Sequence, residues 1–194
     1  MIQTLYNGLP RQIVANGKRY RIKPWFDRVM RVFDIWADPN ILDDDKVIAA
    51  SRLLVCGRPN TDALNATIKL LFGENNKSDT DKKTFDFTQD SGYIYASFLQ
   101  AYGIDLFKMR GRLHWWAFVQ LFNALPDNTR MAQVISIRAR DIPAPTKYNQ
   151  TEIDNLRKLK AAVALEMTQE ERERRLQASL AALAEKLISM AKDD

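Results

Sequence analysis

The stretch FDFTQDSGYIYASFLQAYGIDLFKMRGRLHWWAFVQLFNAL, residues 85–125, decides the fold. Its 41 residues hold 11 of the 19 aromatic residues of a chain of 194. Aromatic side chains bury the largest apolar surface per residue, so the core is expected to form here.

The spacing of apolar residues predicts two helices within this stretch. The first opens near Thr88 or Asp90, both of which are good N-cap acceptors, and ends at Gly103. The second covers 113–125, and Pro126 follows it. Because this second helix is apolar on nearly every side, we expect it to be the central helix, buried on all sides.

An N-terminal hairpin is predicted from Ile13 to Ile22, because Asn16-Gly17 lies between two β-type runs and both turn residues tolerate positive φ. Two strands alone are marginally stable in water. The hairpin is therefore expected to pack on the helices or to pair with another chain.

Apolar periodicity predicts further helices over 25–37, 44–56, 61–72 and 129–139. Asn60 or Thr61 is expected to cap the third of these, and Gly73 to end it. Asp127 or Asn128 is expected to cap the fourth. The polar residues 73–84 are predicted to form a flexible surface loop.

The C-terminal part differs from the aromatic core. Pro143 and Pro145 indicate a linker over 141–149, and two helices are predicted beyond it, over 150–166 and 168–192. The predicted fold class is thus mainly α. A β-hairpin and helical core domain (1–140) precedes the linker, and a helical extension (150–194) follows it.

A leucine stripe marks the last predicted helix, at heptad-like spacings of 4, 3, 4 and 3: Leu176, Leu180, Leu183, Leu187 and Met190. We expect it to be a partner or self-association face, with packing on its own chain as the alternative. Its candidate partners are the 150–166 helix, a second copy of the chain, or a client helix.

Composition places the protein among ordinary globular domains, with 46% hydrophobic and 27% charged residues and a net charge of +5. There is no membrane-length apolar run and no signal-peptide pattern at the N-terminus. The lone Cys56 is predicted to be a small buried residue in a reducing compartment. Together these features favour a cytoplasmic protein without membrane association.

Few residues offer catalytic chemistry. His114 is the only histidine, and we interpret it as the polar start of a helix. Asp86 and Asp90 are interpreted as helix caps rather than a carboxylate pair, and Cys56 has no histidine near it in sequence. Phosphate-binding, nucleophile-elbow and dinucleotide motifs are absent. The sequence therefore predicts a protein that is not an enzyme, with no catalytic, metal or cofactor residues.

Basic residues gather in four clusters: Lys18/Arg19/Arg21, Arg110/Arg112, Arg138/Arg140 and Arg172/Arg174/Arg175. A nucleic-acid groove needs aromatics that face the bases, but here the aromatics follow core spacing. We interpret these clusters as solvated faces and expect no nucleic-acid partner.

Several blocks of residues resemble a known family. They are LYNGLP (5–10) before the Asn16-Gly17 turn, FDF (85–87), YIYASF (93–98), YGIDL (102–106), LHWWAF (113–118) and ISIR (135–138). These blocks, scattered over 1–140, are similar to the gene-product-fifteen type family of long-tailed phages and prophages of Gram-positive bacteria. The family commonly has a short polar segment before the first helix, and Lys23-Pro24-Trp25 departs from that pattern.

The resemblance implies a tail assembly chaperone in the host cytoplasm, which binds the tape measure protein and helps recruit major tail protein subunits. It carries over no catalytic residues. The alternatives are a structural tail or connector component retained in the virion, or a nucleic-acid-binding protein, which rests on charge alone. A homo-oligomer is compatible with each.

Overall fold

The computed structural model describes residues 6–73 and 83–166, which are mainly helical with one antiparallel two-stranded sheet, as predicted. The elements are β1 (Gln12–Ala15), β2 (Lys18–Arg21), α1 (Phe26–Ala37), α2 (Asp43–Leu54), α3 (Thr61–Phe72), α4 (Ser91–Tyr102), α5 (Trp115–Asn123), α6 (Arg130–Ala139) and α7 (Gln150–Ala162). The predicted loop lies mostly outside the described residues, and the 168–192 helix lies wholly outside them.

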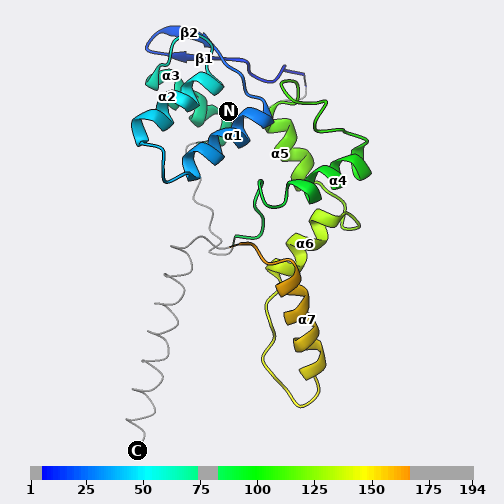
Figure 1. Ribbon diagram of the computed structural model, residues 1–194. Coiled ribbons are helices and arrows are strands. Elements are labelled where there is room, and N and C mark those ends of the chain that lie inside the picture. Colours follow the sequence, from blue (N-terminus) through cyan, green and yellow to red (C-terminus); the bar gives the residue numbers. More distant parts are fainter. Residues whose placement is uncertain (1–5, 74–82, 167–194) are drawn as a thin grey trace, which may run out of the picture.

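The hairpin packs on helices, which was one of the two arrangements expected from the sequence. Asn16 and Gly17 have φ of 48° and 71°, which a two-residue type I′ turn requires. Ile13 and Ala15 of β1 point inward and form a small core with Ala63 of α3. In Figure 1 both strands lie over α2 and α3 at one end of the molecule.

The caps of α3 also follow the prediction. The Asn60 side-chain oxygen accepts a hydrogen bond from the Ala63 N–H, and Gly73 ends the helix at φ 82°. This cap supplies one of the partners that the first turn of a helix otherwise lacks.

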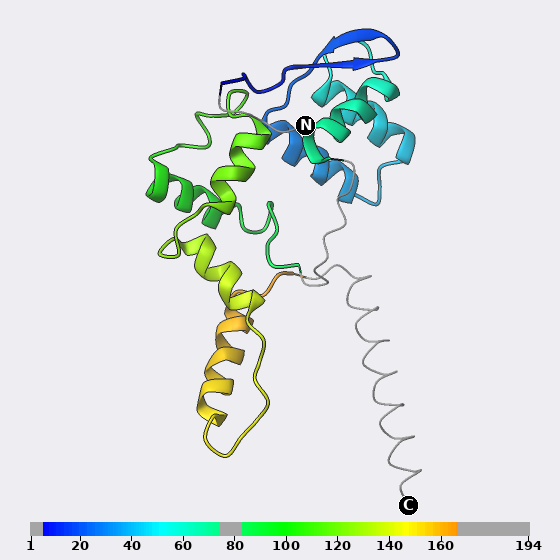
Figure 2. The same ribbon diagram turned by 180° about the vertical axis from the view of Figure 1, so that it is seen from behind.

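The aromatic core forms where α1, α4 and α5 meet. Phe118 of α5 is fully buried, and its ring stacks on Phe26 of α1 at 5.2 Å and on Phe98 of α4 at 5.1 Å. Stacked rings at this separation add favourable contacts to the burial of apolar surface. The prediction that α5 is central is therefore confirmed, and Figures 1 and 2 show it beside both partner helices.

The prediction that this helix is buried on all sides was wrong. Helix α5 is shorter than the expected 113–125, and only Trp115, Phe118 and Phe122 of it are buried. Trp116 and Val119 are only partly buried. Only Gln120 and Asn123 of α5 are exposed, so its other apolar residues are partly covered rather than enclosed.

The first turns of α1 and α5 are held side by side. The Trp115 N–H donates to the Pro24 carbonyl at 2.7 Å, and the Phe26 N–H donates to the Leu113 carbonyl at 3.1 Å. These bonds satisfy donors that the start of each helix would otherwise leave without partners. They also fix the angle at which the aromatic faces of α1 and α5 meet.

Helix α6 packs on α4, where the Met131 N–H donates to the buried Ser97 hydroxyl at 3.0 Å. Its N-cap position is Thr129, so the expectation of Asp127 or Asn128 was wrong. The Thr129 hydroxyl donates to the Pro126 carbonyl at 2.7 Å and holds the preceding turn instead.

Residues 141–149 form no regular element, and α7 then leads back toward the end of α6. Figure 2 shows α7 at the end of the molecule opposite the hairpin. The Lys160 ammonium group donates to the Arg138 carbonyl at 2.7 Å, which joins the last turns of α6 and α7. The division into a core domain and an extension stays a prediction.

Candidate functional site

A groove opens between α1 and α4 and encloses about 460 Å³. Its lining includes the apolar side chains of Phe26 and Met30 from α1, Ile94 from α4, and Phe87 and Leu106 from the adjoining loops. Phe26, Ile94 and Leu106 also belong to the main core, so the groove is a place where that core reaches the surface.

Charged residues form the rim of this groove. Asp27, Arg31 and Asp34 come from α1, and Arg110 comes from the loop before α5. Positions 27, 31 and 34 follow helical spacing, so they lie along one face of α1. An apolar floor between charged edges of both signs suits an amphipathic helix, whose apolar side would face the floor.

The loop before α5 closes one end of the groove. The Gly111 N–H donates to the Asp27 carboxylate at 2.8 Å, which ties this loop to the first turn of α1. The Phe107 ring lies 5.1 Å from the Tyr95 ring of α4, yet Phe107 is 70% exposed. This end therefore presents a large aromatic side chain that its own chain does not cover.

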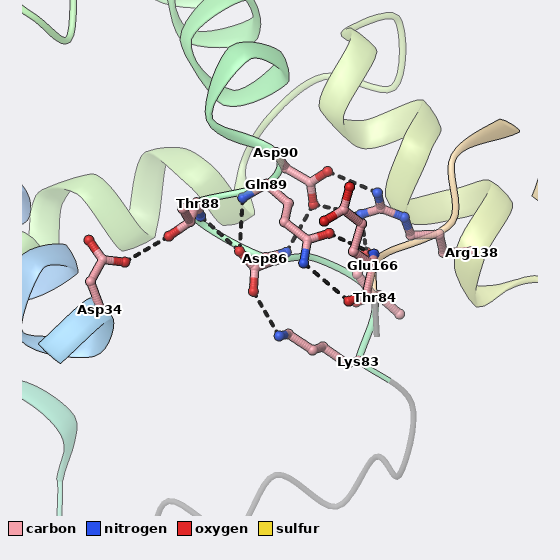
Figure 3. Close-up of polar contacts among 9 residues, drawn as sticks. All are labelled: Asp34, Lys83, Thr84, Asp86, Thr88, Gln89, Asp90, Arg138 and Glu166. Atoms are coloured by element: carbon pink, nitrogen blue, oxygen red, sulfur yellow. Dashed lines mark hydrogen bonds and ion pairs between the residues drawn. The ribbon is translucent and has the colours of Figure 1, made fainter. Parts of the chain in front are cut away.

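A polar cluster holds the opposite end, as Figure 3 shows. The Thr88 hydroxyl donates to the Asp34 carboxylate at 2.8 Å and so links the segment before α4 to α1. One Asp86 carboxylate oxygen accepts the N–H groups of Thr88 and Gln89, each at 2.9 Å. Asp86 thus stabilises the turn that leads into α4, which agrees with its interpretation as a cap.

The same contacts set the ionisation of Asp86. Burial alone would raise its pKa, but the hydrogen bond from Lys83 and those from the Gln89 and Thr88 N–H groups outweigh burial and lower the pKa below the ordinary value. Hydrogen bonds to a carboxylate favour its charged form. The turn before α4 is therefore held by an ionised Asp86 at neutral pH.

Asp90 is not the side-chain cap that the sequence indicated, although it occupies the N-cap position of α4. Its buried carboxylate receives two hydrogen bonds from Arg138 of α6, at 2.6 and 2.8 Å. Arg138 also donates to the carbonyls of Thr84 and Val163. The interpretation of Arg138 as part of a solvated face was therefore wrong.

His114 starts α5, as interpreted from the sequence. Its Nδ1 accepts a hydrogen bond from the Trp116 N–H at 3.1 Å, and its Nε2 lies 3.1 Å from the Pro10 carbonyl. This pair of contacts requires a neutral ring with the proton on Nε2. Burial, together with the nearby positive charge of Arg11, lowers the pKa of His114, although the bond to Pro10 opposes the shift.

Cys56 is exposed, so the prediction of a buried thiol was wrong. It follows the last turn of α2, where its N–H donates to the Arg21 carbonyl. In the first basic cluster, Lys18, Arg19 and Arg21 are exposed on β2, as expected of a solvated face.

The predicted partner face, Leu176, Leu180, Leu183, Leu187 and Met190, lies outside the described residues and stays a prediction. Apolar periodicity did predict the first helix, over 25–37, and with it an apolar face. It gave no sign that part of this face would stay open beside α4, because that depends on contacts between distant segments.

Residues 6–73 and 83–166 contain no group of three or more His, Cys, Asp or Glu side chains placed to hold a metal ion. None of the helices in these ranges is long and apolar enough to cross a membrane.

Comparison with protein families gives a match over most of the chain. The sequence model of a family described as "Bacteriophage Gp15 protein" matches residues 5–165. This match includes α7. It therefore extends beyond residues 1–140, where the similar blocks of sequence lie. No curated protein and no solved structure matches the chain.

Proposed function

The chain belongs to the bacteriophage Gp15 protein family, and from this membership we propose that it is a tail assembly chaperone. In this role it binds the tape measure protein and helps to recruit major tail protein subunits in the host cytoplasm. Membership in this family shows that the chain is a phage protein. We propose the chaperone role, its partners and the lack of enzymatic activity.

The observation that carries the proposal is the groove between α1 and α4. A tape measure protein is a long helical chain with apolar stretches that must be kept soluble before the tail forms. A groove with an apolar floor and charged edges recognises such a chain through apolar residues repeated at helical spacing. The charged edges then remain beside the polar face of the bound helix.

The length of the groove fits a short helical segment. Along α1 it extends from Phe26 to Asp34, eight positions or about 12 Å at 1.5 Å per residue. Two turns of a client helix therefore fill one groove. One such contact is weak, but many copies bound along a long client hold it through multivalency.

The first experiment is capture of the co-expressed tape measure protein by the full-length chain. Phe107→Ser removes the exposed aromatic at one end of the groove, and Tyr148→Ser is the control, because Tyr148 is 90% exposed and does not line the groove. Loss of an aromatic anchor typically costs more than about 1 kcal/mol of binding energy. We expect Phe107→Ser to weaken capture about tenfold and the control to capture normally.

The alternative, a structural tail or connector component, is tested by mass spectrometry of purified phage particles. A chaperone is expected to be absent from particles and present in infected cells. Stoichiometric presence in particles, together with equal capture by the two serine variants, contradicts the proposal.

A further inference from the structure

Strand β1 has an open edge. In an antiparallel pair of strands only every second residue bonds the partner strand. The Ile22 N–H donates to the Arg11 carbonyl at 2.9 Å, which places the odd-numbered residues of β1 at the bonded positions. The N–H and C=O groups of Gln12 and Val14 therefore point away from β2, and no described residue bonds them.

Apart from being short, β1 lacks the features that protect exposed edges. Charged side chains, proline and bulges keep such edges from pairing with another chain. β1 has the sequence Gln-Ile-Val-Ala, without charge or proline, and its register with β2 has no bulge. Val14 is 63% exposed. The other side of the hairpin is covered, because the Cys56 N–H donates to the Arg21 carbonyl and joins β2 to the end of α2.

The net charge of the whole chain is located on this hairpin. Residues 1–26 contain no acidic residue and five of the 29 basic ones: Arg11, Lys18, Arg19, Arg21 and Lys23. The other 24 basic residues are balanced by the 24 acidic residues of the chain. A second copy of the chain would bring five more positive charges to the same edge, so repulsion disfavours pairing of β1 with itself.

Two of these arginines lie beside the open edge. Arg19 is opposite Val14, and Arg21 is opposite Gln12. Directly opposite residues of neighbouring strands lie on the same face of a sheet, so both arginines share the solvent face with Val14. Both are exposed, and neither forms an ion pair with a described residue. A strand added to β1 would lie about 10 Å from β2, two strand spacings away, which arginine and acidic side chains span together.

From the open edge, the unbalanced positive charge and the two exposed arginines, we propose that β1 binds an extended acidic segment of a partner protein as an added strand. Gln12 and Val14 bond the backbone of this segment, and the two arginines select its acidic side chains. Alternate residues of a strand lie on one face, so the matching sequence has Glu or Asp at every second position. The inference goes beyond the proposed function, because no residue of β1 or β2 lines the α1–α4 groove.

Nucleic acid is the other anionic polymer that a basic hairpin can attract, but it fits this edge poorly. Phosphates can accept from N–H groups, yet they offer no donor to the C=O groups of Gln12 and Val14. Single strands also need aromatic side chains on which their bases stack. The only aromatic residue of β1 and β2, Tyr20, is opposite the buried Ile13 and so lies on the face toward the helices.

The test adds a short synthetic peptide, in which glutamate alternates with valine, to the ¹⁵N-enriched full-length protein. The amide NMR signals of Gln12 and Val14 should shift at millimolar peptide, whereas a groove signal such as that of Ser91 should keep its position. A peptide with lysine in place of glutamate should bind at least about tenfold more weakly. The acidic peptide with methylated backbone nitrogens should weaken by a similar factor, because it cannot donate to the C=O groups of β1.

Two matched variants of Val14 show whether the edge is responsible. Val14→Pro removes the outward N–H, and proline is tolerated where the N–H of an edge strand faces solvent, so the bonds between β1 and β2 remain. Binding of the acidic peptide should weaken at least about tenfold. Val14→Thr keeps the N–H and should bind nearly as the wild type does. An unchanged signal from Ala63, which packs under the hairpin, establishes that the hairpin is intact in both.

Two matched double variants test the charge. Arg19→Gln with Arg21→Gln removes both arginines beside the edge and should weaken binding of the acidic peptide about fivefold. Lys147→Gln with Lys158→Gln removes two charges from exposed residues in and before α7, and should leave binding unchanged. Equal effects of the two double variants contradict a role for the arginines in selecting the segment.

Equal binding of the acidic peptide and its methylated form overturns the proposal with the wild-type protein alone, as does the absence of any shift at Gln12 and Val14. Single-stranded DNA that binds wild type and Val14→Pro equally, and more tightly than the peptide, assigns the charge to nucleic acid instead. A wild-type dimer that Val14→Pro converts to a monomer assigns the edge to a second copy. No experiment here contains the tape measure protein, so a failure is distinct from a failure to capture it.

Discussion

Arg138 and Asp90, 48 residues apart, form a two-point ion pair in which each guanidinium nitrogen donates to a different carboxylate oxygen, at 2.6 and 2.8 Å. Their side chains are only 9% and 2% exposed. Two further Arg138 donors bond the Thr84 and Val163 carbonyls. One side chain thus joins α6 to the start of α4 and to the end of α7.

Asp90→Asn is expected to lower the free energy of unfolding by about 3–5 kcal/mol, because it leaves the Arg138 charge buried without its counter-ion. Urea unfolding followed by tryptophan fluorescence measures the change. Asp154→Asn is the control, since its pair with Arg157 is about half exposed and should contribute no more than about 1 kcal/mol. Equal losses in the two variants would contradict the buried role of the Asp90–Arg138 pair.

Phe118→Ala is expected to cost about 3–5 kcal/mol, the usual range for deleting a buried aromatic side chain. Phe118 contacts rings from α1 and α4, so its loss opens a cavity between three helices. Tyr148→Ala removes an aromatic ring that is 90% exposed and should change stability by about 0.5 kcal/mol or less. A Phe118→Ala protein with the same melting temperature as the wild type would show that α5 is not the centre of the core.

His114 is expected to make stability fall as the pH drops below about 6.5, the ordinary pKa of histidine. The folded state lowers this pKa, so the unfolded chain binds the proton first and gains free energy relative to the folded chain. The contribution of neutral His114 to the free energy of unfolding is therefore complete above pH 6.5. It is lost as the pH falls toward the pKa that His114 has in the folded state. Protonation of Nδ1 also ends its bond to the Trp116 N–H.

The check is the melting temperature at about pH 7.5 and about pH 5.5 for the wild type and for His114→Asn, which keeps a capping acceptor. The wild type should lose more stability over this interval than the variant does. Asp86 does not interfere, because its pKa is lowered from 3.8 and it titrates only in stronger acid. Parallel pH profiles would contradict a neutral, buried His114.

Cys56 is expected to react with a thiol reagent in the folded protein at a rate near that of the unfolded chain, because the residue is exposed. Absorbance of the released thiolate follows the reaction in native buffer and in urea. Cys56→Ser should leave the melting temperature unchanged. A thiol that reacts only in urea would restore the original prediction of a buried residue.

Local features of the fold could be predicted from the sequence. The Asn16-Gly17 turn, the Asn60 cap and the Gly103 end of α4 each depend on neighbouring residues, and all three are present. The aromatic density of 85–125 also predicted where the core forms. Such signals are readable because backbone conformation and capping bonds are set within a few positions along the chain.

Features that depend on distant contacts could not be read in this way. From the sequence Asp90 is interpreted as a helix cap. Its carboxylate pairs with Arg138 instead, a contact that exists only because α6 packs beside the start of α4. Cys56 looks apolar, but the chain leaves the end of α2 at the surface. The groove is lined jointly by α1, by α4 and by the segments that precede α4 and α5, an arrangement that no periodicity within one helix records.

The stacking of Phe26 on Phe118 also has a consequence for the order of events during synthesis. The two residues are 92 positions apart in the chain. At translation rates of about 5–20 residues per second, α1 is made roughly 5–20 s before its partner on α5. During that interval the hairpin, α2 and α3 can assemble with α1, while the Phe26 ring still lacks the Phe118 ring that covers it in the folded chain. The N-terminal part of the nascent chain is therefore most prone to aggregation just before α5 emerges.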